Sequence, residues 1–83
     1  MEFTGKDERI SEWVAGVQKN RGVDAELTLD YCKKIEAYAK EKENNALLGF
    51  AYYYSGETYY GLNDSEKLFQ YISKALTCLD ETE

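Results

Sequence analysis

The chain has 83 residues, 43% hydrophobic and 31% charged, and its 10 basic and 16 acidic side chains give a net charge of −6. This length allows one small domain, and the apolar content is high enough for it to fold. We expect no nucleic-acid partner, because the negative surface repels phosphate backbones. We also expect no membrane span, because the longest uncharged stretch, residues 44–56, is shorter than the roughly 20 apolar residues that a spanning helix needs.

The first residues and the cysteines indicate a cytoplasmic protein without a metal or a cofactor. Acidic residues near the N-terminus stand where a secretion signal requires a basic start and an apolar core. Cys32 and Cys78 lie far apart in the sequence, and the chain has no His and no Cys-x-x-Cys pair. This spacing is typical of neither a zinc site nor a redox site. Both cysteines lie on apolar helical stripes, so we expect buried thiols.

Apolar residues recur at helical spacing along the chain, and no alternation typical of a strand persists. We therefore predict an all-α fold of four antiparallel helices. They would form two helix-turn-helix hairpins, over residues 7–42 and 44–79, within a single domain over residues 1–83. The acidic, polar end of the chain resembles a linker, so we expect this chain to be the N-terminal part of a longer protein.

Side chains that can accept hydrogen bonds from free backbone N–H groups mark the expected helix starts. For the first three helices these are Asp7, Asp24, and Asn44 or Asn45. The fourth helix is expected to begin at Asn63, with Glu66 completing a capping box. Gly22 is expected to end the first helix, because glycine readily adopts the left-handed conformation found there.

Residues 46–54 are apolar on every side of a helix, which predicts that the third helix is central. The side chains expected to be buried between the four helices are Trp13, Val14, Leu47, Leu48, Leu68, Ile72 and Leu76. The buried face of the fourth helix is expected to include also Phe69, Ala75 and Leu79.

The two hairpins are partly similar in sequence. The shift of the sequence against itself that places Gly16 on Gly49 aligns the first helix with the third. A larger shift, which places Tyr31 on Tyr71, aligns the second helix with the fourth. The extra residues that the larger shift requires would lie around residues 56–63, in a longer third helix and the turn that follows it.

Residues 44–79 resemble a tetratricopeptide repeat, a helical hairpin that stacks into superhelical arrays. The similarity rests on Leu48-Gly49, on Tyr52 three residues later, and on the small Ala75 in the following helix. It implies a module that binds a protein or peptide in a concave groove lined by the first helix of each hairpin.

By their spacing, Phe50, Tyr53, Tyr54 and Glu57 share one face of the third helix. The shift that places Gly16 on Gly49 matches this face to Val17, Asn20 and Arg21, with Trp13 just above. The resemblance implies that these residues line the groove, with Arg21 on one side and Glu57 on the other.

The stretch of residues 47–64 also resembles the helical region ahead of GGDEF diguanylate cyclase domains in some Gram-positive bacteria. The Gly-Gly-Asp-Glu-Phe motif itself is absent from this chain. The resemblance therefore implies a bacterial signalling module whose attached catalytic domain would lie beyond Glu83.

We expect no catalysis by this chain, because it has no His and its six glycines form no phosphate-binding pattern. The first hypothesis is a protein-interaction or sensory module. The alternative is a small-molecule binder with a tyrosine-lined pocket, since the eight tyrosines are compatible either with core packing or with a ligand site. Glu57 is either a solvated carboxylate or a buried group bonded to tyrosine.

A symmetric homodimer is also expected. A domain of this size buries only about 60% of its unfolded surface and gains stability from further apolar burial. The residues expected to remain exposed in a monomer and to pair across the two-fold axis are Phe50, Tyr53, Tyr54 and Tyr60.

Overall fold

The computed structural model describes residues 8–82, with side chains for residues 8–78. It contains four α-helices and, over these residues, no strand: α1 (Glu8–Asn20), α2 (Ala25–Glu41), α3 (Asn45–Gly61) and α4 (Ser65–Thr82). The predicted all-α fold of two helical hairpins is confirmed. None of the helices, as far as they are described, combines the length and the apolar character needed to cross a membrane. The expected cap Asp7 and the side chain of Leu79 lie outside the described residues.

The expected starts of the second and third helices are confirmed. The N–H of Leu27 donates to Oδ1 of Asp24 at 3.0 Å, and the N–H of Leu47 donates to Oδ1 of Asn44 at 3.0 Å. Gly22, at the end of α1, has a φ of 75°. This is the left-handed conformation that glycine adopts without steric cost, as expected from the sequence.

The expected start of the fourth helix is wrong by one residue. Asp64, and not Asn63, accepts the bond from the free N–H of Lys67, at 3.1 Å. Asn63 has a φ of 61° and donates its backbone N–H to the carbonyl of Tyr60 at 3.0 Å. Asn63 is thus used in the left-handed turn that ends α3, a conformation that asparagine tolerates better than most residues. The cap therefore falls to the next residue.

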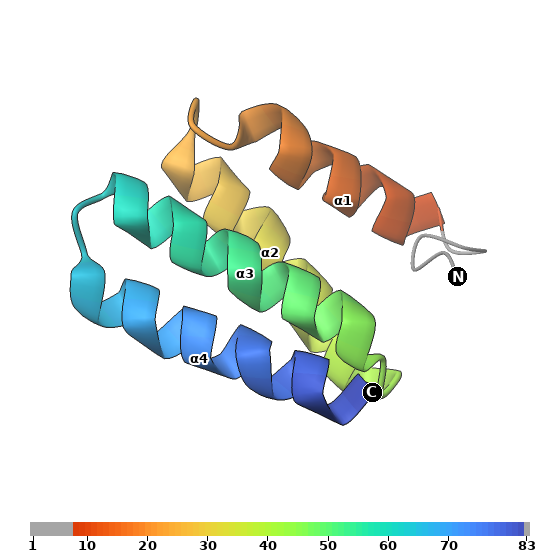
Figure 1. Cartoon of the computed structure of the whole chain (residues 1–83). Coiled ribbons are helices and arrows are strands. Elements are labelled where there is room, and N and C mark those ends of the chain that lie inside the picture. Colours follow the sequence, from red (N-terminus) through yellow and green to blue (C-terminus); the bar gives the residue numbers. More distant parts are fainter. Residues whose placement is uncertain (1–7, 83) are drawn as a thin grey trace.

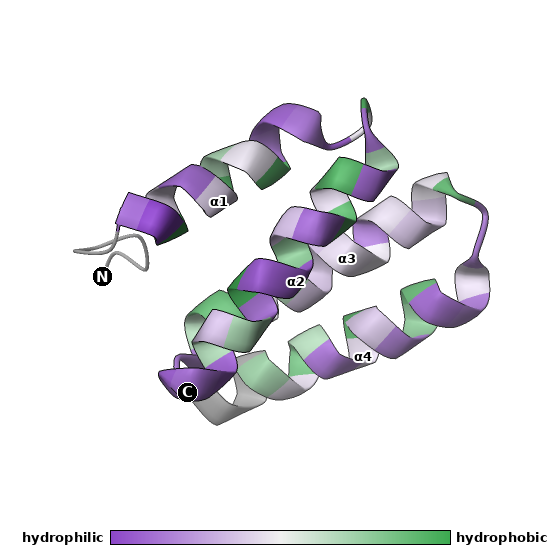
Figure 2. Ribbon diagram, turned by 180° about the vertical axis from the view of Figure 1, so that it is seen from behind, coloured by the Kyte–Doolittle hydropathy of each residue, from purple (hydrophilic) through white to green (hydrophobic). Residues whose placement is uncertain are grey.

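Each helix packs mainly against its neighbours in sequence, so that α3 lies between α2 and α4 (Figure 1). The fully or nearly fully buried core joins α1, α2 and α3, and consists of Ile10, Val14, Val17, Cys32, Ile35, Ala39, Leu47 and Ala51. The central position expected for the third helix is confirmed. Figure 2 shows α3 pale along most of its length, because its many tyrosines lie near the middle of the hydropathy scale.

A smaller cluster joins α4 to α3 and consists of Tyr52, Ala75 and Cys78. Both cysteines are buried, as expected. Of the other side chains expected to be buried, Val14 and Leu47 are buried, whereas Trp13, Leu48, Leu68 and Ile72 are partly buried.

The burial expected for Leu76 and Phe69 is wrong, because these side chains are 56% and 70% exposed. The reason is that α4 packs chiefly against one helix, which covers only a narrow stripe of its surface. Apolar residues on one side of that stripe are left open to solvent.

The structure replaces the two sequence shifts by a single one, the larger, which places Tyr31 on Tyr71. The same shift places the cap Asp24 on the cap Asp64. A Cβ atom added to Gly16 would meet the ring of Tyr31, and one added to Gly56 would meet Ile72 and Cβ of Tyr71. The counterpart of Gly16 is therefore Gly56, and the helices of the hairpins α1–α2 and α3–α4 pack in the same register.

Candidate functional site

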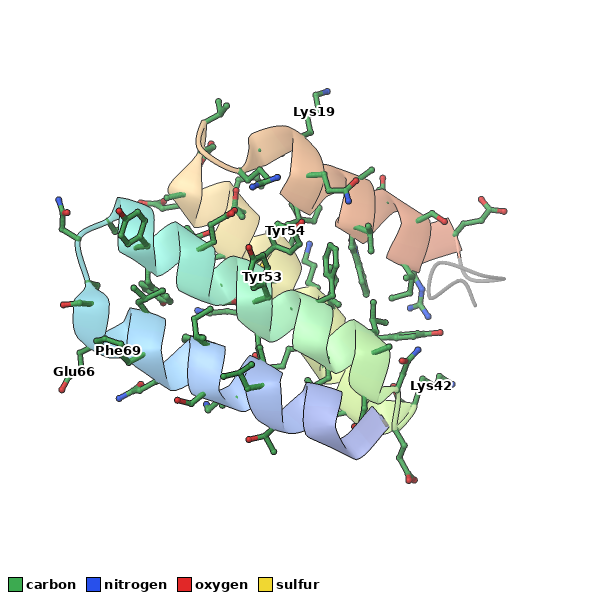
Figure 3. All side chains as sticks on the ribbon, viewed as in Figure 1. Lys19, Lys42, Tyr53, Tyr54, Glu66 and Phe69 are labelled. Atoms are coloured by element: carbon green, nitrogen blue, oxygen red, sulfur yellow. The ribbon has the colours of Figure 1, made fainter. Side chains whose placement is uncertain are left out.

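The aromatic residues predicted on α3 form one continuous surface. The ring centroid of Tyr54 lies 4.7 Å from that of Phe50 and 5.0 Å from that of Tyr53. Figure 3 shows Tyr53 and Tyr54 beside each other on α3. Tyr53 is 48% exposed, so its ring offers apolar surface to a partner.

Arg21 and Glu57 bind each other. Nε and Nη2 of Arg21 donate to Oε1 and Oε2 of Glu57 at 2.9 and 2.8 Å. The guanidinium also lies over the ring of Tyr54, at 5.2 Å from its centroid. The hydrogen bonds to Glu57 raise the pKa of Arg21. Glu57 is thus a partly exposed carboxylate paired with Arg21, and not a buried group bonded to tyrosine. The two charges do not lie on opposite sides of a groove, because they bind each other.

The predicted residues on α1 are not part of a common binding face. Val17 is fully buried in the core and cannot contact a ligand. Asn20 donates its side-chain N–H to the carbonyl of Gly16 at 2.8 Å, within its own helix. Trp13 packs edge-on against Tyr38, with ring centroids 6.4 Å apart. The implied concave groove over α1 and α3 is therefore only partly present, since its α1 side is core or locally bonded.

The aromatic residues of α3 instead line a groove against α4, of about 400 Å³. We call it the α3–α4 groove, and its lining residues are Ala46, Gly49, Phe50, Tyr53, Tyr54, Ile72, Ala75 and Leu76. None of these described side chains is charged. The α4 side was not predicted from the sequence, because Leu76 was expected to be covered. Aligning the whole second hairpin with the first by the larger of the two shifts could have revealed the α4 side of the groove.

A second hollow, of about 610 Å³, lies where α1 ends and α3 ends. The paired Arg21 and Glu57 form part of its lining, together with Gly22, Gly61 and Leu62. Because the two charges already satisfy each other, this hollow presents no unpaired charged group from that pair to a ligand.

A further group of tyrosines lies on another side of α3 and α4. We call it the tyrosine–lysine face, made of Tyr52, Tyr59, Tyr71, Lys67 and Lys74. Tyr59 and Tyr71 stack at 5.6 Å between centroids. Nζ of Lys74 lies 5.5 and 5.1 Å from the ring centroids of Tyr52 and Tyr71, and Nζ of Lys67 lies 5.3 Å from that of Tyr59. Burial raises the pKa of Tyr52 and of Tyr71. The tyrosines of these two surfaces thus do not converge on one pocket, and the other three, Tyr31, Tyr38 and Tyr60, belong to neither surface.

The described residues show neither a readily ionised Cys32 thiol nor a cluster of metal ligands. Burial raises the pKa of the Cys32 thiol to about 11, so the reactive thiolate is scarce at neutral pH. Over the described residues, no three His, Cys, Asp or Glu side chains are grouped closely enough to hold a metal ion. The α3–α4 groove is therefore the best candidate for a functional site.

Compared with known proteins, the chain matches no family model, no curated protein and no solved structure. The resemblances to tetratricopeptide repeats and to the region ahead of diguanylate cyclase domains thus stay predictions.

Proposed function

We propose that this chain is a non-catalytic protein-interaction module that binds a segment of a partner protein in the α3–α4 groove. The observation that carries the proposal is the open, uncharged lining of this groove, where Tyr53 and Leu76 leave about half of their surface to solvent. Contiguous exposed apolar surface of this kind commonly marks an interface. Exposed aromatic side chains are also the residues that most often dominate binding energy.

A small-molecule ligand is the alternative. The groove volume of about 400 Å³ falls within the range of roughly 300–1,000 Å³ that is usual for ligand sites. Such sites also present a few converging polar groups, and here the side-chain polar atoms are those of Tyr53 and Tyr54 alone. The lining therefore favours a protein segment.

The proposal is tested by selecting peptides from a display library against the chain and locating their binding site by amide chemical-shift changes. Leu76→Lys places a charge in the groove, whereas Gln70→Lys adds the same charge to an exposed position elsewhere on α4. We expect Leu76→Lys to weaken binding about tenfold or more, equivalent to about 1.4 kcal/mol, and Gln70→Lys to leave it unchanged. Peptides that shift the tyrosine–lysine face, or that bind both variants equally, would contradict the proposal.

The prediction of an interaction module has three further parts, which concern an attached enzyme, the cellular location and the oligomeric state. Regulation of an attached signalling enzyme and a cytoplasmic location stay predictions. A homodimer through Phe50, Tyr53, Tyr54 and Tyr60 also stays a prediction, which the exposure of Tyr53 and Tyr60 supports. Such a dimer would compete with a partner protein, because the first three of these residues line the α3–α4 groove.

A further inference from the structure

The repeated hairpin indicates what could fill the α3–α4 groove. On the first hairpin, α3 covers one face of α2, and Thr28, Cys32 and Ile35 are fully buried. Their counterparts on α4, by the shift that places Tyr31 on Tyr71, are Leu68, Ile72 and Ala75, which form the α4 side of the groove or adjoin it. Ala75 is buried against α3, and Ile72 lies beside Gly56 of α3. Ile72 and Leu68 nevertheless stay partly exposed, because among the described helices α4 packs extensively against α3 alone.

The other side of the groove has the same origin. Ile10 and Val14 of α1 are buried in the core that α1 and α2 share with α3. Their counterparts by the same shift are Phe50 and Tyr54, which line the groove. The α3–α4 groove thus occupies the position, relative to its own hairpin, that α3 fills on the first hairpin. A helix is the element that fits this position.

The packing of α3 also specifies the side chains of such a helix. Leu47, Ala51 and Ser55, four residues apart, are the buried side chains that α3 carries along this side. Two of the three are small, which allows neighbouring helices to approach closely, and Ser55 hydrogen-bonds Cys32. A helix with one leucine followed by small residues at four-residue spacing would reproduce these contacts.

Charges around the groove favour a basic helix. Glu57, the one charged residue of α3, is already paired with Arg21, so a charge preference can come only from α4 and from the chain as a whole. Lys67 and Lys74 of α4 are engaged by the rings of the tyrosine–lysine face. Since each residue turns a helix by about 100°, Lys74 points roughly opposite to Leu76. Figure 3 shows the acidic Glu66 close to the exposed Phe69 at the start of α4. The whole chain carries −6 charges, which also disfavours a second copy as the occupant.

We propose that the α3–α4 groove binds an amphipathic helix of a partner protein, with a leucine and small residues at four-residue spacing and with lysine or arginine beside this stripe. This inference rests on the proposed function and adds the conformation and the charge of the bound segment. Opposite charges would speed association and select the partner, while apolar burial in the groove would supply most of the affinity.

Three synthetic helical peptides of the length of α3, 17 residues, test the inference by fluorescence anisotropy with the full chain. The first carries the stripe of Leu47, Ala51 and Ser55 with basic flanks, the second carries the same stripe with acidic flanks, and the third has basic flanks and a serine in place of the leucine. In about 0.1 M salt we expect the basic striped peptide to bind at least about tenfold more tightly than either of the others. In about 1 M salt, where the Debye length falls to about 3 Å, the preference over the acidic peptide should shrink to a few-fold.

Leu76→Lys and Tyr53→Lys should each reduce binding of the basic striped peptide about tenfold or more, and Gln70→Lys should reduce it much less. Two groove variants are used because both positions are about half exposed, so that at least one should fold normally by circular dichroism.

Each contrary outcome overturns a defined part of the reasoning. Equal binding of basic and acidic striped peptides would remove the charge preference and leave the proposed function standing. Failure of all three peptides, while display-selected extended peptides bind the groove, would remove the helix. A dimer in sedimentation that Leu76→Lys disrupts, and that no peptide displaces, would show a second copy as the occupant and overturn the inference.

Discussion

Replacing Gly16 by alanine should destabilise the protein, although alanine is the better helix former. The propensity difference inside a helix favours alanine by about 1 kcal/mol. Against this, the added Cβ would lie 2.6, 2.7 and 2.8 Å from three ring atoms of Tyr31. The ring must therefore move by nearly an ångström, and overpacking of this kind costs about 1 to 3 kcal/mol. We expect a net loss of about 1 kcal/mol in the free energy of unfolding.

Two other glycines of the same helical type provide matched controls. A Cβ at Gly56 would lie 3.0 Å from Cδ1 of Ile72, the flexible end of that side chain, so the two effects should nearly cancel. A Cβ at Gly49 would meet its nearest neighbour, Cβ of Cys78, at 3.4 Å, which is an ordinary contact. Gly49→Ala should therefore stabilise the protein by about 0.5 to 1 kcal/mol.

Urea titrations with linear extrapolation measure all three variants, and a constant m-value would show that the denatured state is unchanged. Gly16→Ala should become stabilising when Tyr31 is first replaced by alanine, because the ring is then absent. If Gly16→Ala stabilises the unmodified protein as much as Gly49→Ala does, the close approach of α1 to Tyr31, and with it the reasoning on the repeat, is refuted.

Three other outcomes are expected from urea titrations. Ile35→Ala should cost about 2 to 5 kcal/mol because Ile35 is fully buried, whereas Leu76→Ala should change stability by no more than about 0.5 kcal/mol; similar losses would show that α4 is covered on both sides. Asp64→Ala should cost about 1 kcal/mol through loss of the cap. Asn63→Gly removes the other candidate cap but keeps the left-handed turn, so a larger loss from Asn63→Gly than from Asp64→Ala would return the cap to Asn63. The pKa of the Cys32 thiol rises from 9.0 to about 11 on folding. As the pH rises through this range, the unfolded chain loses the thiol proton before the folded protein does. The free energy of unfolding should therefore fall by about 2 to 3 kcal/mol. Cys32→Ala should remove that part of the fall.

The helix starts could be predicted where they depend on neighbouring residues. Asp24 and Asn44 each bond the backbone three residues ahead, so a short sequence window contains all that is needed. At Asn63 two local preferences compete, since the residue suits both a cap and a left-handed turn. The turn that joins α3 to α4 decides between them, and this depends on how the two helices pack.

The candidate site was predictable on α3 but not on α4. Spacing identified Phe50, Tyr53 and Tyr54 as one face, and the structure places their rings in contact. The same periodicity marked Leu76 as apolar, but it could not tell how many neighbours α4 has. Exposure depends on that number, which is a property of the tertiary fold.

The shift that aligns the first helix with the third could not be chosen from the sequence either. One shift places Gly16 on Gly49 and the other places it on Gly56, and the two differ by almost two helical turns. A given residue is therefore matched to nearly the same helix face, within about 20°, by either shift. Helical periodicity therefore cannot distinguish them. Only the contact of Gly56 with Ile72 and Tyr71, and of Gly16 with Tyr31, shows that the larger shift is correct.

The sequential packing of α1 to α4 has a consequence for how the chain folds. Because each helix finds its main partner in the next helix along the chain (Figure 1), the segments that must meet are separated by short loops, and closing them costs little entropy. Chains dominated by such local contacts fold within about microseconds to milliseconds. The same order leaves each end helix with one main neighbour, α2 for α1 and α3 for α4. Opening of an end helix can then precede global unfolding, as expected for cooperative units of unequal stability.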